Sequence, residues 1–91
     1  MSFHAITPQK VQHASGYIVQ VADRYSVDCI EAGRTWRITV DFGQSVGLYK
    51  QSIRCFDAAG KAVLFDSAAA DAAAQKIALG LQAMGSKTEW C

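Results

Sequence analysis

The chain has 91 residues, of which 51% are apolar, and nine Lys and Arg against eight Asp and Glu give a net charge of +1. This length predicts a single domain, residues 1–91, whose core needs no metal or disulfide for stability. The balanced charge argues against the class of nucleic-acid-binding proteins, whose members usually carry a clear basic excess. No apolar run reaches the roughly 18–20 residues that span a bilayer.

The cysteines and histidines form no metal-binding pattern. Cys29, Cys55 and Cys91 are an odd number without a CxxC pair, which is typical of a reducing compartment. His4 and His13 are too far from these cysteines in the sequence for the usual zinc spacing. The chain also lacks the pattern of a signal peptide. We therefore expect a cytoplasmic protein with no metal site and no cofactor.

Residues 1–15 give the least defined pattern. Thr7 and Pro8 suit the first two positions of a helix, so a short helical turn is expected to run through His13. Ser15 and Gly16 then end this segment.

Residues 16–66 alternate between apolar and polar positions, which predicts strands with one buried face. The clearest run is Trp36–Phe42, where Trp36, Ile38, Val40 and Phe42 face one side. Ala32 and Gly33 suit a two-residue hairpin turn. Five strands follow from the pattern: 17–21, 25–29, 36–42, 49–55 and 62–65.

One antiparallel register satisfies most of these strands together. On the inner face it pairs Cys29 with Trp36, Val27 with Ile38, Tyr25 with Val40, Phe42 with Tyr49, Val40 with Gln51, Ile38 with Ile53, and Trp36 with Cys55. On the outer face it aligns Arg24–Asp41–Lys50, Ser26–Thr39–Ser52 and Asp28–Arg37–Arg54. Opposite charges thus lie beside each other in most of these pairs.

A helical period replaces the alternation after residue 66. Asp66 or Ser67 suits the N-cap of a helix over 67–84, and Gly85 suits its end. Its apolar stripe comprises Ala70, Ala73, Ala74, Ile77, Leu81 and Met84. Residues 85–91 are a polar tail. The fold class is therefore α+β: an antiparallel meander of about five strands with one C-terminal helix packed on one face.

Three basic residues are a candidate site for an anion or nucleic acid. Arg37, Arg54 and Lys50 fall on the predicted outer face, where two guanidinium groups can hold a phosphate or carboxylate. Alternatively, Asp28 neutralises Arg37 and Arg54 points into solvent. Binding of single strands also requires aromatic rings beside the charge, and five rings are predicted to face inward instead: Tyr17, Tyr25, Trp36, Phe42 and Tyr49.

A small apolar group on the same face is the candidate partner interface. It comprises Ile18, Ile30, Phe56 and Leu64. Either the N-terminal segment or the tail covers these residues, or they bind another chain. The sequence contains no recognisable catalytic motif. We expect a small non-catalytic interaction domain that forms a homodimer or binds a protein partner; the alternative is nucleic-acid or anion binding through the outer face.

Overall fold

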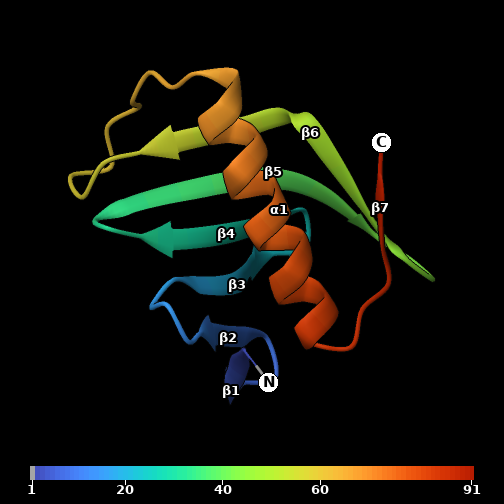
Figure 1. Ribbon diagram of the computed structural model, residues 1–91. Coiled ribbons are helices and arrows are strands. Elements are labelled where there is room, and N and C mark those ends of the chain that lie inside the picture. Colours follow the sequence, from blue (N-terminus) through green and yellow to red (C-terminus); the bar gives the residue numbers. More distant parts are fainter. Residues whose placement is uncertain (1) are drawn as a thin grey trace.

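A computed structural model describes residues 2–91 as one curved sheet with a single helix lying across one of its faces (Figure 1). The elements are β1 (Phe3–Thr7), β2 (Lys10–His13), β3 (Ile18–Asp23), β4 (Ser26–Glu31), β5 (Arg34–Phe42), β6 (Val46–Phe56), α1 (Ser67–Ala83) and β7 (Thr88–Trp90). The strands lie in chain order, each antiparallel to the one before it, except that β7 is parallel to β6. The α+β class is confirmed, with seven strands where about five were expected.

The two ends of the chain account for the additional strands. Residues 3–13 form the β1–β2 hairpin, so the expected helical turn after Pro8 is wrong. The hydroxyl of Thr7 accepts a hydrogen bond from the amide of Gln9 (3.2 Å), which closes a tight turn in place of a helix start. The tail contributes β7. Residues 62–65 do not form a strand, because only Ala62 makes a bridge, to Phe56.

The sequence predicted the turn between β4 and β5 correctly but not the turn between β3 and β4. Ala32 and Gly33 both have positive φ angles, 52° and 77°, as the predicted two-residue turn requires. Cys29 accordingly pairs with Trp36 and Val27 with Ile38, as expected. The preceding turn instead contains Tyr25, whose amide donates to the Asp23 carboxylate (2.8 Å). Tyr25 is therefore 62% exposed and not a core residue, which corrects the prediction.

The register between β5 and β6 shifts halfway along the hairpin. Trp36 pairs with Cys55 and Arg37 with Arg54, as predicted, but Thr39 pairs with Tyr49 rather than Ser52. β6 thus contains three extra residues, 50–52, that have no partner on β5. Because side chains alternate between the two faces of a strand, an odd number of extra residues places the side chains before the insertion on the face opposite to the predicted one.

Several predicted pairs are consequently wrong. Val46 and Leu48 are buried in β6, while Phe42 and Tyr49 are each 41% exposed. Besides Thr39–Ser52, the predicted pairs that fail between β5 and β6 are Phe42–Tyr49, Val40–Gln51 and Asp41–Lys50. The Ser52 hydroxyl hydrogen-bonds two backbone groups at the register shift: it accepts from the Thr39 amide (2.8 Å) and donates to the Tyr49 carbonyl (2.6 Å).

The helix agrees closely with its prediction. Asp66 caps it by accepting from the amide of Ala69 (2.8 Å), and Gly85 follows the last turn with a φ of 95°. The buried face of α1 comprises Ala70, Ala73, Ala74, Ile77, Ala78, Gly80 and Leu81. It packs on the inner face of the sheet above Trp36 and Ile38, which are buried as expected. Within residues 2–91, α1 has neither the length nor the apolar character of a membrane-crossing helix.

Candidate binding surfaces

The helix covers only one face of the sheet. α1 packs against β2, β3, β4 and β6, and residues 2–91 contain no second helix for the opposite side (Figure 1). We call this opposite side the outer face; it carries Ile18, Ile30, Arg37, Arg54 and Phe56. Both proposed sites therefore lie largely on a face that no other element covers.

Arg37 and Arg54 lie directly opposite each other on β5 and β6. The Nε and Nη2 atoms of Arg37 donate to the two carboxylate oxygens of Asp28, at 2.8 and 3.0 Å. Asp28 is only 3% exposed, and its hydrogen bonds raise the pKa of Arg37. This arrangement is the predicted alternative in which Asp28 neutralises Arg37. Arg54 is exposed and makes no ion pair with any residue from 2 to 91.

Lys50 does not join the two arginines. It lies in the three-residue insertion of β6, and its amino group pairs with Asp71 on the helix (2.5 Å). The structure therefore brings together Arg37 and Arg54 but not the predicted set of three.

The apolar group forms one row across four strands. Ile18 pairs with Ile30, and Thr35 joins Ile30 to Phe56. All four side chains are partly exposed, and the guanidinium of Arg37 lies 5.7 Å from the ring centre of Phe56. A shallow cavity of about 320 Å³ adjoins the row, lined by Thr35, Arg37, Phe56, Asp57, Ala58 and Gly60. We call Ile18, Ile30, Thr35 and Phe56 the outer row.

Within residues 2–91, neither terminal segment covers the outer row. The N-terminal segment forms β1 and β2 at one edge of the sheet, and the tail forms β7 at the other. Leu64 does not belong to the row: it is 99% exposed in the loop before α1, because residues 62–65 are not a strand.

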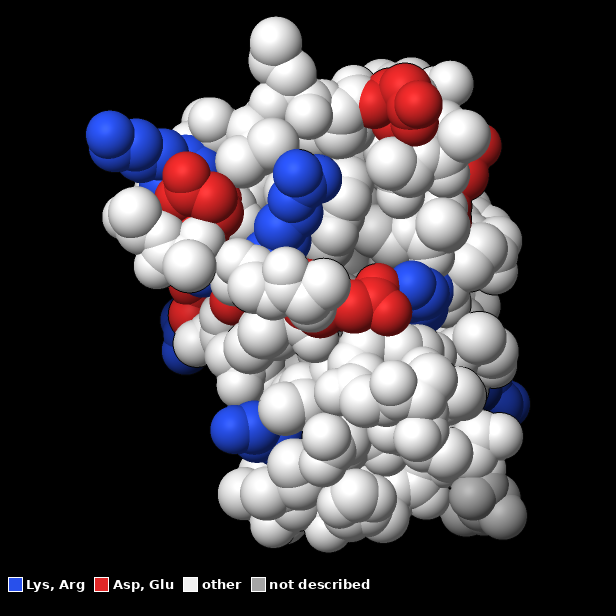
Figure 2. Space-filling model, turned by 60° about the vertical axis from the view of Figure 1, so that its left-hand side comes forward, with Lys and Arg blue, Asp and Glu red and all other residues white. Residues whose placement is uncertain are grey.

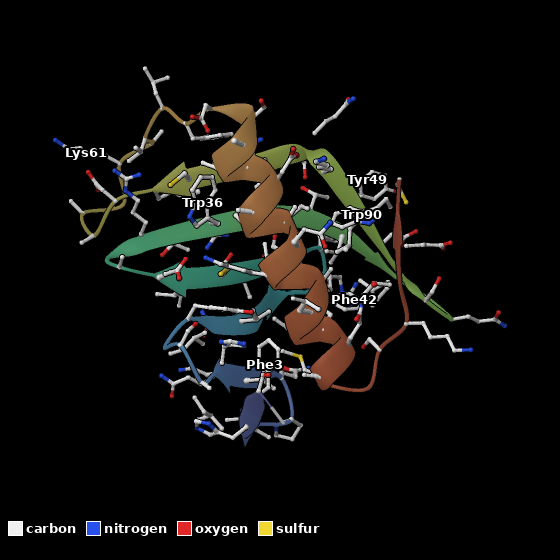
Figure 3. The ribbon with its side chains drawn as sticks, viewed as in Figure 1. Phe3, Trp36, Phe42, Tyr49, Lys61 and Trp90 are labelled. Carbon is white, nitrogen blue, oxygen red and sulfur yellow. The ribbon has the colours of Figure 1, made fainter. Side chains whose placement is uncertain are left out.

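Three exposed aromatic rings lie away from the arginines. Tyr25, Phe42 and Tyr49 occupy the end of the sheet opposite the Ala32–Gly33 turn. Figure 3 shows Phe42, Tyr49 and Trp90 at this end and Trp36 beside the N-terminal half of the helix. The alternation of apolar and polar residues predicted that Tyr25, Phe42 and Tyr49 face inward, so the sequence did not indicate that these rings are exposed.

Two of the three cysteines, Cys29 and Cys55, are buried in the core. Burial raises the pKa of Cys29 to about 12 and also raises that of Cys55, so both thiols stay protonated. All three cysteines are free, as expected from the strand that separates Cys29 and Cys55. No group of three His, Cys, Asp or Glu side chains within residues 2–91 could hold a metal ion. Comparisons with protein-family models, curated proteins and solved structures found no match.

Proposed function

We propose that this chain is a non-catalytic interaction domain that binds a protein partner through the outer row. The observation that carries the proposal is the row of Ile18, Ile30 and Phe56, with Thr35 between the last two, on an uncovered sheet face. Uncovered apolar groups bordered by polar residues are typical of protein-binding surfaces. The cytoplasm remains the proposed location, since three cysteines without a disulfide suit a reducing compartment.

The charges beside the row indicate the chemistry of the partner. Arg54 has no ion pair within residues 2–91, whereas Asp28 already occupies two donors of Arg37. A segment that places apolar side chains on the row and a carboxylate on Arg54 would complement both features. We therefore propose an apolar segment with a neighbouring acidic residue as the ligand.

Nucleic-acid or anion binding through Arg37, Arg54 and Lys50 is the second candidate. The exposed pair Arg37 and Arg54 favours it, as does the partly exposed ring of Phe56 beside Arg37. Lys50 is paired with Asp71, however, and Tyr25, Phe42 and Tyr49 lie at the other end of the sheet. Single-stranded nucleic acid requires stacking rings and cations along one path. These features support the protein ligand over the nucleic acid.

Selection from a displayed library of random 12-residue peptides tests the proposal. We expect the selected peptides to share apolar residues beside Asp or Glu, and amide shifts on titration to concentrate on β3–β6. Phe56→Asp and Arg54→Glu should each weaken binding at least tenfold, while Tyr25→Asp, an exposed position at the other end, should not. Selected peptides that bind both row variants normally would contradict the proposal.

A 20-nucleotide single strand of DNA or RNA is the second probe. Binding that weakens steeply with salt and is lost in Arg54→Glu would favour the nucleic-acid candidate instead. The protein-ligand proposal expects no such binding at physiological salt.

A further inference from the structure

The edge of the sheet formed by β1 is open and unprotected. Only β2 borders this strand, and Phe3–Thr7 contain no Lys, Arg, Asp or Glu. Natural proteins usually protect such edges with charge or by keeping them very short. The opposite edge carries such a charge, because β7 includes Glu89.

Backbone groups of Phe3 and Ala5 are directed to this open edge. Phe3 lies opposite His13 of β2. The backbone amide of His13 donates to the carbonyl of Tyr17, on the side of β2 that faces away from β1, so His13 and Phe3 share no backbone hydrogen bond. Hydrogen-bonding directions alternate along a strand. His4 therefore faces β2, while Phe3 and Ala5 direct their amide and carbonyl groups outward. The register shift after Ala5 limits the regular edge to these three residues.

The surface above this edge is also uncharged. Phe3 lies beside the C-terminal half of α1 (Figure 3), and a groove of about 380 Å³ separates them, lined by Ser2, Phe3, Leu79, Gln82 and Ala83. Leu79 is 47% exposed. In Figure 2 the charged side chains gather mainly in the upper part of the molecule, while the lower part, where Figure 1 places β1 and β2, is nearly free of them.

We propose that two copies of this chain associate through β1, antiparallel and centred on His4, into one continuous sheet. Phe3 of one copy then lies opposite Ala5 of the other, and the outward groups of both pairs form four hydrogen bonds. The twofold axis stands perpendicular to the sheet, so both helices lie on the same side. This interface is separate from the outer row and does not rest on the proposed ligand.

A second copy suits this surface because the surface is complementary to itself. Phe3 is large and Ala5 is small, and in the dimer the Phe3 side chain of each copy lies beside the Ala5 side chain of the other on the inner face. β1 contains no Lys, Arg, Asp or Glu, so no ammonium, guanidinium or carboxylate group of this strand meets its own copy across the axis; the residue on the axis is His4. Stable dimers bury roughly 800 Å² on each partner, more than three residues of strand edge present. Leu79 and Ala83 beside the groove extend the contact to the helices.

Light scattering and sedimentation of the tag-free chain test the dimer. We expect a dimer at tens of micromolar. Ala5→Pro removes an amide that faces the edge and no bond to β2, and such a proline is tolerated in edge strands. It should weaken the dimer at least tenfold while the circular dichroism spectrum stays unchanged.

Leu79→Lys provides a second variant that leaves the backbone of β1 untouched. It places like charges near the axis and should also weaken the dimer at least tenfold. Phe56→Asp, on the outer row, is the matched control and should leave the dimer intact. A monomeric wild type would overturn the proposal. Dissociation by Phe56→Asp, with Ala5→Pro and Leu79→Lys still dimeric, would overturn it too and place the contact on the outer row.

Discussion

The close approach of α1 to β3 depends on Gly80, which has no side chain. A Cβ atom at this position would lie 2.4 Å from the Cβ of Val19 and 2.5 to 2.6 Å from its two methyl groups. Val19 is fully buried and β-branched, so it cannot move aside. Glycine is unfavourable within a helix by about 1 kcal/mol relative to alanine. The packing between helix and sheet must therefore offset that cost.

Gly80→Ala should destabilise the fold despite the higher helix propensity of alanine. Overpacking of this kind costs about 1–3 kcal/mol, and we expect a loss in that range from urea denaturation. Gln75→Ala, at an exposed position of the same helix, is the control and should change stability by less than about 0.5 kcal/mol. A higher melting temperature in Gly80→Ala would show that α1 lies farther from β3.

Cys29 makes stability depend on pH above neutrality. Burial raises its pKa from 9.0 to about 12. Below pH 9 the thiol keeps its proton in both states, so it has no effect; above pH 9 only the unfolded state loses the proton. The free energy of unfolding should therefore fall by about 1 kcal/mol from this group between pH 8 and pH 10. Urea denaturation at the two pH values should show a smaller decrease in Cys29→Ala, and an equal decrease would contradict the assignment.

At the scale of single elements, prediction succeeded where local sequence decides the geometry. The Ala32–Gly33 turn and the Asp66 cap each contain residues suited to one backbone conformation, so β4, the start of β5 and α1 could be located. The alternation in β6 continued through residues 50–52, however, and gave no sign that the strand bulges there. That shift moved Lys50 to the helix and exposed Tyr49, so the candidate anion site was only partly predictable.

Ser52 holds this irregular part of β6 in place. Ser52→Ala removes the hydroxyl that accepts from the amide of Thr39 and donates to the carbonyl of Tyr49. Both groups can reach water, so we expect a loss of about 1–2 kcal/mol in unfolding free energy, the range of one or two hydrogen bonds. Hydrogen exchange at Thr39 should also become faster. Ser52→Thr keeps a hydroxyl and should retain most of the stability; equal stability of wild type and Ser52→Ala would exclude the role.

At the scale of the whole molecule, the strands that the sequence did not predict are those formed through contacts with other segments. The N-terminal hairpin is held in the sheet by the pairing of β2 with β3. β7 is held by its pairing with β6, although the helix lies between these two strands in the sequence. Short segments of this kind have weak local preferences, so their partners decide their conformation. Strand β5 was predictable because apolar and polar residues alternate strictly from Trp36 to Phe42, and Trp36, Ile38 and Val40 are indeed buried.

The two tryptophans should differ sharply in their contribution to the free energy of unfolding. Trp36 is 8% exposed beneath α1 and packs edge-on against Phe65, with ring centres 5.2 Å apart, whereas Trp90 on β7 is 46% exposed. Trp36→Ala should cost about 3–5 kcal/mol, a large part of the 5–15 kcal/mol that is typical of a folded domain. Trp90→Ala should cost less than about 1 kcal/mol. Thermal and urea denaturation of both variants measure this difference. Similar losses would mean that β7 belongs to the core and that the helix does not cover Trp36 as the structure shows.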